Sequence, residues 1–370
     1  MTTKIIISGG GTGGHIYPAI AIANELKAID STIEILFVGA EGKMEAEKVP
    51  KAGYEIVLLP IVGIKRELSL ANLAFPFKLL RSLLKARQIV KDFKPDVAVG
   101  VGGFASGPLL MVASLLGIPT LIQEQNSYAG ITNKLLAKRA KAVCVAYPNM
   151  EAFFPKNKIK VTGNPVRKDI LDVAHKRPAA YAHFGLDANR KTLLIIGGSL
   201  GAKTINESIE AGLKTLLESG YQLLWQTGKP YSEKAQAAVK ALKTNHAQAL
   251  EFIYEMDLAY AVADVVVSRA GALSVSELCL VAKPCILVPF PFASEDHQTQ
   301  NAMNLVEQNA ALLVKDKDAK EELVQTALRL LGDLQKQEEL IKNIQKLSKP
   351  NAASDIAAEI LKLTKKVEKC

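Results

Sequence analysis

The chain has 370 residues, of which 49% are hydrophobic and 22% are charged, and its formal net charge is +9. This composition is too apolar for a disordered chain, and the length is sufficient for two domains. The positive charge favours anionic partners, such as nucleotide diphosphates or an anionic membrane surface. Nucleic acid is not expected, because only 6% of the residues are aromatic and no segment interleaves them with basic residues.

The cysteine pattern gives no sign of a metal site. Cys144, Cys279, Cys285 and Cys370 have no metal-ligand spacing, so we expect free thiols in a reducing compartment. The chain opens directly on a strand pattern, so no signal peptide is expected. Residues 97–123 carry no charge, but glycines and prolines interrupt them. A strand, a loop, a helix and a second strand therefore fit better than one membrane-spanning helix.

The segment Lys4–Ala21 reads KIIISGGGTGGHIYPAIA and predicts a strand, a glycine loop and a helix. The helix is expected over Ile16–Leu26, with Pro18 in its first turn. Glycines let backbone N–H groups approach an anion, and a helix N-terminus adds a positive dipole. The segment is therefore expected to hold a phosphate or a sugar beside His15.

Two other interpretations of this loop remain open. Gly9, Gly11 and Gly14 satisfy the dinucleotide fingerprint, but a nicotinamide site needs an acidic residue at the end of the second strand. That strand ends at Gly39, and Glu41 comes late. A tight turn without a ligand is the remaining alternative.

Strand and helix patterns alternate through the first half. The expected strands are Lys4–Ser8, Ile33–Val38, Glu55–Leu59, Val97–Val101, Thr120–Gln123 and Ala142–Val145. This alternation predicts a parallel sheet covered on both faces, with ligands beyond the carboxyl ends of the strands.

Residues 64–93 contain an amphipathic helical pattern. Lys78, Arg81 and Lys85 fall within one arc of a helical wheel. The opposite side is expected to hold Leu79, Leu80, Leu83, Leu84 and Val90, with Phe75, Pro76 and Phe77 at the start. This is either an ordinary helix packed on the sheet or a basic and apolar patch that contacts an anionic bilayer.

Three further segments of the first half are candidates for binding. A second glycine loop covers Gly100–Pro108, and a polar cluster around Asn126 follows the fifth strand, where a capped helix start is the alternative. Residues 163–167 read GNPVR and are expected to connect two domains. Arg167 either reaches into a cleft or is a solvated linker residue.

The second half repeats the alternating pattern. The expected strands are Thr192–Ile196, Leu223–Gln226, Leu250–Ile253, Asp264–Ser268 and Cys285–Val288. A glycine loop containing Ser199 follows the first of them. Glu277 is expected in the first turns of a helix, where a carboxylate either complements the helix dipole or accepts hydrogen bonds from a vicinal diol. Residues 351–367 are predicted to form one amphipathic helix.

Seven segments, in this order and spacing, resemble the MurG family of glycosyltransferases. They are GGGTGGHIYPAIAIA, GGFASGP, QEQNSYAGITNKLLAK, GNPVR, GGSLGA, SRAGALSVSE and DHQTQNA, between residues 4 and 315. The resemblance implies the α/β GT-B fold, in which two Rossmann-like doubly wound domains face a central cleft. It implies that residues 1–163 form an N-terminal domain that binds the acceptor and the membrane. Residues 164–345 would form a C-terminal domain that binds UDP-N-acetylglucosamine, and residues 346–370 a helix that packs back on the first domain.

The resemblance also implies a reaction. N-acetylglucosamine passes from its UDP donor to the 4-hydroxyl of the N-acetylmuramoyl-pentapeptide on undecaprenyl diphosphate, with inversion, in peptidoglycan synthesis. No cofactor is implied, because helix N-termini and backbone N–H groups can hold the diphosphate without a metal. The one D-x-D string, at Asp316 and Asp318, is expected to face solvent.

Site residues are carried over position by position. The donor contacts implied are Thr12, Gly13, Gly14, Asn126, Arg167, Ser199, Ile253, Ala272, Leu273, Ser274, Val275, Ser276, Glu277 and Gln298. Glu277 would hold the ribose, the backbone of Ile253 the uracil, and Ser199 with the helix start at Ala272 the diphosphate. Phe104 and Ser274 stand where the family has an aromatic hydroxyl and a threonine.

The acceptor loop is expected to include Gly103, Phe104 and Ser106. His15 is the candidate general base, because imidazole titrates near neutral pH, and a structural role for its ring is the alternative.

The family is peripheral on the cytoplasmic face of the bacterial inner membrane. By resemblance the membrane patch consists of Phe75, Phe77, Lys78, Leu79, Arg81 and Lys85. Cell-wall and division proteins are further implied partners.

Four other functions compete with this assignment. Another GT-B enzyme could add a sugar to diacylglycerol. A non-hydrolysing UDP-N-acetylglucosamine 2-epimerase would need paired carboxylates around the sugar, and none lies near the glycine loops in the sequence. A nicotinamide dehydrogenase is disfavoured by the second strand. A non-catalytic nucleotide-sugar binder would need neither His15 nor a membrane patch.

Overall fold

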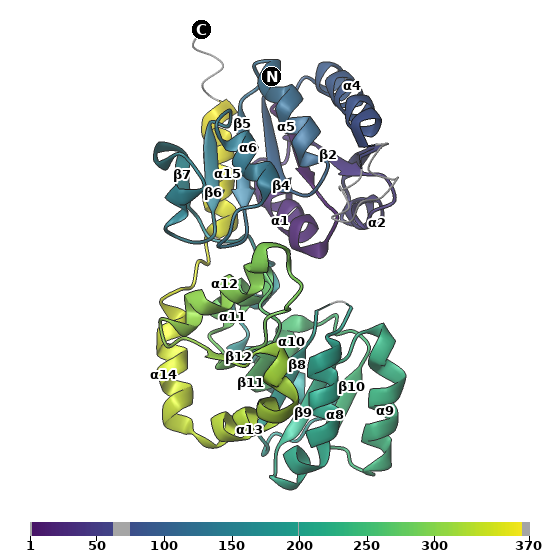
Figure 1. The fold of residues 1–370 in the computed structure, drawn as a ribbon, viewed down its shortest axis with the longest axis vertical. Coiled ribbons are helices and arrows are strands. Elements are labelled where there is room, and N and C mark those ends of the chain that lie inside the picture. Colours follow the sequence, from purple (N-terminus) through teal and green to yellow (C-terminus); the bar gives the residue numbers. More distant parts are fainter. Residues whose placement is uncertain (1, 62–74, 199, 365–370) are drawn as a thin grey trace. The chain divides into compact units, whose positions relative to one another are not determined.

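The computed structural model describes residues 2–61, 75–198 and 200–364, without the side chains of Lys168 and Ser294. The chain divides into two units (Figure 1). Unit 1 comprises Met1–Val166 together with Asn351–Cys370, and unit 2 comprises Arg167–Pro350. Each contains one parallel sheet, and the α/β fold class predicted from the sequence is confirmed.

The sheet of unit 1 has seven strands in the order β3-β2-β1-β4-β5-β6-β7. Their bounds are β1 Lys4–Gly9, β2 Glu34–Ala40, β3 Glu55–Leu59, β4 Val97–Gly102, β5 Thr120–Glu124, β6 Ala142–Val145 and β7 Ile159–Val161. Successive residues of β1 point to opposite faces, so that Ile6 joins one buried cluster while Ile5 and Ile7 join the other. Both faces therefore need a covering layer.

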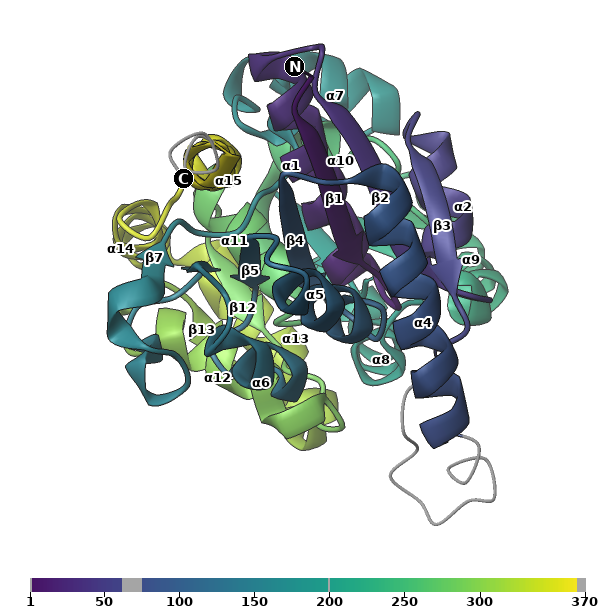
Figure 2. The ribbon, with the colours of Figure 1, turned by 90° about the horizontal axis from the view of Figure 1, so that it is seen from above.

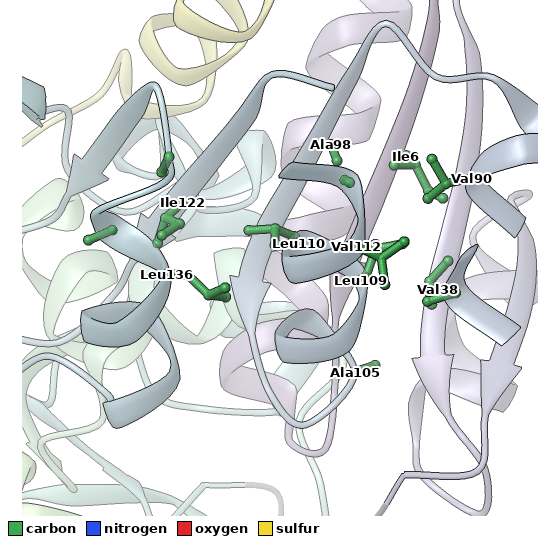
Figure 3. Packing of buried hydrophobic residues seen from close by; sticks show 14 of the residues in the cluster. Ile6, Val38, Val90, Ala98, Ala105, Leu109, Leu110, Val112, Ile122 and Leu136 are labelled. Atoms are coloured by element: carbon green, nitrogen blue, oxygen red, sulfur yellow. The ribbon is translucent and has the colours of Figure 1, made fainter. Parts of the chain in front are cut away.

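Helices cover both faces of this sheet (Figure 2). On one side lie α4 (Phe75–Phe93), α5 (Ser106–Leu115) and α6 (Ile131–Ala137), whose buried residues pack with Ile6 and Val38 (Figure 3). On the other side lie α1 (Gly13–Ile29), α2 (Glu45–Lys51) and α15 (Ala352–Thr364). The C-terminal helix α15 packs against α1 through Ile356, Ala357 and Ile360.

Unit 2 has a six-stranded sheet in the order β10-β9-β8-β11-β12-β13. The strands are β8 Thr192–Ile196, β9 Gln222–Gln226, β10 Ala247–Leu250, β11 Ala263–Ser268, β12 Cys285–Leu287 and β13 Leu312–Leu313. The helices are α7 Arg177–Phe184, α8 Lys203–Glu218, α9 Ser232–Ala241, α10 Met256–Val262, α11 Ala272–Val281, α12 His297–Val306, α13 Ala319–Gly332 and α14 Leu334–Gln345.

The structure corrects several boundaries. The strand predicted over Leu250–Ile253 is wrong, because β10 ends at Leu250 and Ile253 lies in the following loop. The short edge strands β7 and β13 were not predicted. Helix α1 begins at Gly13, so Pro18 lies inside it and not in its first turn. The glycines that suggested a loop thus also form the start of the helix.

Each sheet has a point where the strand order reverses direction. In unit 1 it falls between β1 and β4, and in unit 2 between β8 and β11. In open parallel sheets, ligands bind beyond the carboxyl ends of the two strands at such a point. The three glycine loops predicted from the sequence follow β1, β4 and β8, and Gly271 lies in the segment that follows β11.

Candidate functional site

The two glycine loops of unit 1 are in direct contact. The N–H of Gly10 donates to the carbonyl of Gly102 over 3.3 Å. A Cβ placed on Gly103 would lie only 2.3 Å from the carbonyl oxygen of Gly10, and Gly103 has φ +88°. A side chain at this position would therefore separate the loops.

His15 lies in the first turn of α1, half-buried against both loops. Its Nδ1 is 3.1 Å from the carbonyl oxygen of Gly10 and 3.4 Å from Oγ1 of Thr12. A Cβ on Gly102 would lie 2.5 Å from Cδ2 of the ring. Since a carbonyl oxygen only accepts, we assign the proton to Nδ1, which makes Nε2 the nitrogen able to take a proton.

The other predicted residues of this edge differ in exposure. Thr12 and Gly14 are exposed, Gly13 is half-buried, and the side chain of Phe104 is 46% exposed. Ser106 is fully buried, with Oγ 2.8 Å from the carbonyl oxygen of Gly102 and 2.9 Å from that of Ser8. Its hydroxyl therefore joins the second glycine loop to β1 inside the protein.

Asn126 lies in a turn that is organised by Glu124, a residue missed in the sequence analysis. The buried carboxylate of Glu124 accepts hydrogen bonds from the N–H groups of Asn126 and Gly130 and from Nδ2 of Asn133. These distances are 3.1, 3.0 and 2.8 Å. An acidic residue at the end of a buried strand was the signal that could have identified it.

In unit 2, the helices α8 and α11 begin beyond the carboxyl ends of the neighbouring strands β8 and β11. Ser199 lies outside the described residues. Gln226, at the end of β9, connects two predicted donor segments: its Nε2 donates to the carbonyl of Gly198 over 3.0 Å, and its Oε1 accepts from the N–H of Ile253 over 3.0 Å. The N–H of Ile253 is thus engaged within the protein, and its side chain is buried.

Glu277 lies on α11, within the predicted segment Ala272–Glu277. Oε2 of Glu277 accepts a 2.9 Å hydrogen bond from the hydroxyl of Tyr260, which is itself buried. Burial raises the pKa of Glu277 above its ordinary value, although the Tyr260 hydrogen bond and the positive charge of Arg167 oppose that shift. Arg167 also forms an ion pair with Asp169, with 3.1 Å between Nε and Oδ1.

The remaining predicted donor residues are partly accessible. Ala272, Leu273, Ser274 and Ser276 are half-buried, whereas Val275 is buried. Gln298 is half-buried, and its Oε1 accepts from the N–H of Phe290 over 2.9 Å.

The expectation that Asp316 faces solvent is wrong. Its carboxylate pairs with Arg269, which follows β11, and Oδ2 accepts a 3.0 Å hydrogen bond from Thr204 on α8. The two charged side chains are only 11% and 16% exposed. Arg269 also donates to the carbonyls of Val288 and Pro289 at the end of β12, over 3.1 Å each. A buried ion pair thus joins the segments that follow three strands.

The amphipathic helix α4 differs from its helical-wheel prediction. Phe75, Leu79 and Leu83 pack against the core of unit 1, but Leu80 and Leu84, expected on the same side, are 57% and 60% exposed. Phe77 is 73% exposed. The buried stripe runs through Ser82, Ala86, Ile89 and Val90, so it is narrower than the predicted apolar half. The first part of the predicted amphipathic pattern, residues 64–74, lies outside the described residues.

Basic side chains stand next to these exposed apolar ones. A cavity of about 790 Å³ is lined by Lys78, Arg81 and Lys85 of α4, together with Glu41, Gly42, Pro60, Ile61, Leu84 and Gln88. Nζ of Lys85 lies 3.7 Å from Oε1 of Glu41.

Cys144, Cys279 and Cys285 are buried free thiols. Burial raises the pKa of Cys144 and of Cys279 to about 12, which makes them poor nucleophiles. Within the described part of the chain, no group of three or more His, Cys, Asp or Glu side chains is arranged to hold a metal ion. In the same residues, no helix is both long enough and apolar enough to span a bilayer.

Comparison with known proteins places these features in a family. Residues 5–145 match the model of the glycosyltransferase family 28 N-terminal domain, and residues 192–359 match that of the C-terminal domain. A crystal structure of MurG from Acinetobacter baumannii superposes with a TM-score of 0.80 at 32% identity, over 97% of this chain and 99% of that one. A UDP-GlcNAc 2-epimerase from Neisseria meningitidis, solved with UDP-GlcNAc, superposes with a TM-score of 0.68, but its 16% identity shows only a shared fold.

Curated relatives are more similar in sequence. A protein of Cytophaga hutchinsonii is 56% identical over 360 residues, which are 97% of this chain and 96% of that protein. A protein of Parabacteroides distasonis is 52% identical over 363 residues, or 98% and 99% of the two chains. Both are named UDP-N-acetylglucosamine–N-acetylmuramyl-(pentapeptide) pyrophosphoryl-undecaprenol N-acetylglucosamine transferase. The chain therefore belongs to glycosyltransferase family 28 and, within it, to the MurG family.

Proposed function

We infer that this protein transfers N-acetylglucosamine from UDP-N-acetylglucosamine to the muramoyl-pentapeptide carried by undecaprenyl diphosphate, converting lipid I to lipid II in peptidoglycan synthesis. The observation that carries this inference is the 52–56% identity to curated transferases of that name over nearly the whole chain. In each sheet, glycine-containing segments follow both strands at the point where the strand order reverses. This arrangement supports substrate binding by both units.

The donor is bound by unit 2 in this proposal. Tyr260 holds one oxygen of the Glu277 carboxylate, and the ribose hydroxyls donate to that carboxylate. The diphosphate lies at the N-termini of α8 and α11, where backbone N–H groups and the helix dipoles stabilise negative charge. The other predicted donor contacts, including Thr12, Asn126 and Ser199, stay predictions.

The acceptor is bound by unit 1, beside the two glycine loops and Phe104. Nε2 of His15 takes the proton of the 4-hydroxyl, whose oxygen forms a bond to the anomeric carbon from the face opposite UDP. The bond from that carbon to the diphosphate oxygen breaks, and its electron pair leaves with UDP. Inversion follows from this single displacement, and the leaving charge is stabilised by the helix N-termini.

A product assay tests the inferred reaction. Purified protein is incubated with UDP-N-acetylglucosamine and, in separate reactions, a short-chain lipid I analogue, diacylglycerol or no acceptor. We expect UDP and a disaccharide product with the lipid I analogue alone, also with a chelator present. Glycosylated diacylglycerol would identify another lipid glycosyltransferase. Epimerisation of the donor at C2 without an acceptor would identify an epimerase.

We also propose that α4 docks the protein on the cytoplasmic face of the bacterial inner membrane. Phe77, Leu80 and Leu84 expose apolar surface next to Lys78, Arg81 and Lys85. Apolar insertion combined with basic residues is the pattern of proteins that bind anionic bilayers peripherally. Contacts with cell-wall and division proteins stay a prediction.

Replacing Phe77, Leu80 and Leu84 by Ser is expected to lower binding to anionic vesicles at least about tenfold, because each exposed apolar side chain contributes up to about 1.5–3 kcal/mol when buried. Vesicle flotation measures this effect, and activity on a water-soluble acceptor should stay unchanged. The matched control replaces Ile131 and Leu135 of α6 by Ser. These side chains are similarly exposed, at 65% and 69%. Equal vesicle binding by both variants would contradict the proposal.

A further inference from the structure

A buried carboxylate lies directly behind the first glycine loop. Glu45 is the first residue of α2 and is fully buried. Its Oε2 accepts a 2.8 Å hydrogen bond from the N–H of Gly11, and its Oε1 accepts a 3.0 Å hydrogen bond from the N–H of Ala40 at the end of β2. A buried carboxylate needs such donors, because desolvation without them is unfavourable.

The backbone around Glu45 leaves no room for other side chains. A Cβ placed on Gly10 would lie 2.1 Å from Oε1 of Glu45, and one on Gly39 would lie 2.5 Å from its Cγ. Two glycines, Gly10 in the first glycine loop and Gly39 in β2, thus make the space that this carboxylate occupies. One consequence concerns the loop itself: the N–H of Gly11, which the sequence suggested for an anionic ligand, is already engaged by a protein carboxylate.

Glu45 and His15 contact opposite ends of one peptide group. The N–H of Gly11 and the carbonyl of Gly10 belong to the same amide, since these residues are adjacent. Glu45 binds the N–H end at 2.8 Å, and Nδ1 of His15 is 3.1 Å from the carbonyl oxygen. Hydrogen bonds in a chain polarise one another, so a carboxylate on the N–H makes the carbonyl a stronger acceptor.

We propose that Glu45 is a positioning residue that acts on His15 through the Gly10–Gly11 peptide group. The carboxylate fixes and polarises this amide, the amide carbonyl holds the Nδ1 proton of His15, and Nε2 is thereby oriented as the proton acceptor. This arrangement resembles a carboxylate–histidine pair with a peptide inserted, and it orients the ring in the same way. The effect of Glu45 on catalysis rests on the proposed function. The chain of hydrogen bonds from Glu45 to His15 is independent of that function.

The elements packed around His15 contribute few other charges. The second glycine loop, residues 100–107, carries no titratable side chain. On α2, Glu47 forms an ion pair with Lys51, 2.7 Å apart and exposed, and Lys48 lies 3.6 Å from Glu47. On α1, Tyr17 is 46% exposed. Among the described residues of α1, α2 and the second glycine loop, Glu45 is therefore the charged side chain that is fully buried beside the first glycine loop.

The test compares Glu45→Gln with the parent protein. Removing the negative charge disfavours the imidazolium form, so the pKa of His15 should fall by about half to one unit. We expect kcat to fall by about 10–100-fold, the range seen when the partner that orients a metal-ligating histidine is lost, with KM for the donor changed less than about twofold. The acidic limb of kcat/KM should move to lower pH by the same amount as the pKa of His15.

The direct readout is the ¹⁵N spectrum of the histidine rings as a function of pH, with His15 assigned through His15→Gln. This measurement needs no substrate, so it tests the hydrogen-bonded chain even if the lipid I assay fails. In the parent protein, Nδ1 of His15 should carry the proton in the neutral ring. A proton on Nε2, or a His15 pKa that is equal in the parent and Glu45→Gln, would overturn the proposal.

Two controls separate positioning from a loss of fold. Glu47→Gln removes an exposed carboxylate from the same helix and should leave both the His15 pKa and kcat unchanged. Ser8→Ala removes a buried hydrogen bond to the carbonyl of Val38 and should lower stability without moving the pH profile. If Glu45→Gln does not fold, Glu45→Asp keeps the charge on a shorter side chain. Glu45→Asp should show a lowered kcat with a pH profile of kcat/KM close to that of the parent. An acidic limb moved to lower pH, as expected for the neutral Gln side chain, would contradict the proposal.

Discussion

Replacing His15 by Ala is expected to lower kcat by about 10²–10⁴-fold, the range of a positioned general base, with little change in the binding of UDP-N-acetylglucosamine. The ring lies against the two glycine loops of unit 1, and its Nδ1 is 3.1 Å from the carbonyl oxygen of Gly10. Because the ribose and diphosphate contacts of the donor are assigned to unit 2, removal of the ring should affect chemistry much more than donor affinity. Steady-state kinetics with a lipid I analogue and calorimetric titration with the donor measure the two effects separately.

The alternative for His15 is a structural role, which has a different signature. If the ring only fills space between the loops, His15→Ala should lose stability, and added imidazole should not restore the rate. If the ring is the base, imidazole should restore part of the rate by occupying the cavity left behind. His175→Ala, which removes an exposed histidine paired with Asp172, serves as the control and should keep full activity. A rate within twofold of the parent for His15→Ala would exclude the role of general base.

The fold could be predicted because most strands are short, continuous runs of β-prone residues bounded by glycine or charge. β3, β6 and β8 have the predicted bounds. The strand near Leu250 was misplaced because β10 alternates apolar and polar residues at Ala247–Leu250, whereas the more apolar residues follow it. The edge strands β7 and β13 are too short to carry a pattern of their own, and pairing with their neighbours defines them.

Candidate site residues could be identified in the sequence only where they follow a strand closely. His15 lies beside glycines in the first turn of α1, and Glu277 lies in the second turn of α11, close after β11, which marks both as candidates in the sequence. Glu45 binds a loop 34 residues away, and Arg269 pairs with a carboxylate 47 residues away. Such pairs depend on which strands become neighbours, and no local pattern specifies that. Glu41, the acidic residue considered after the second strand, lines the cavity beside α4, whereas Glu45, four residues later, binds the glycine loop.

The amphipathic helix shows a similar limit. A helical wheel assigns Leu80 and Leu84 to the apolar half, yet only a narrow stripe of α4 meets the sheet. Leu79 and Leu83 pack on the core, and the two leucines beside them remain exposed. The width of the buried stripe depends on how the helix lies on the sheet, which the sequence pattern does not contain. Substitutions of Phe75 or Leu79 would therefore affect the core of unit 1 as well as any membrane contact.

Replacing Asp316 by Ala is expected to destabilise unit 2 by about 3–5 kcal/mol, because it leaves the buried guanidinium of Arg269 without its partner. At about 2–4 °C per kcal/mol for a domain of this size, the melting temperature should fall by roughly 10 °C. Calorimetry measures the change. Asp318→Ala, which removes the same charge two residues away, should shift the melting temperature by less than about 2 °C. Equal shifts for the two variants would show that the charge of this segment matters and the Arg269 pair does not.

The Arg269–Asp316 ion pair should also influence the donor site, because it connects the segments after β11 and β12 to the start of α8. Arg269 binds the carbonyls of Val288 and Pro289, and Asp316 binds Thr204 in the first turn of α8. Loss of the carboxylate frees the start of α8, whose N–H groups are assigned to the diphosphate. We therefore expect Asp316→Ala to raise KM for UDP-N-acetylglucosamine at temperatures where the protein is still folded. In Arg269→Met/Asp316→Ala no guanidinium is left unpaired, so its loss of stability should be smaller than the sum of the two single losses. If the stability losses of the two single variants add up to the loss of the double variant, the two charges do not stabilise each other.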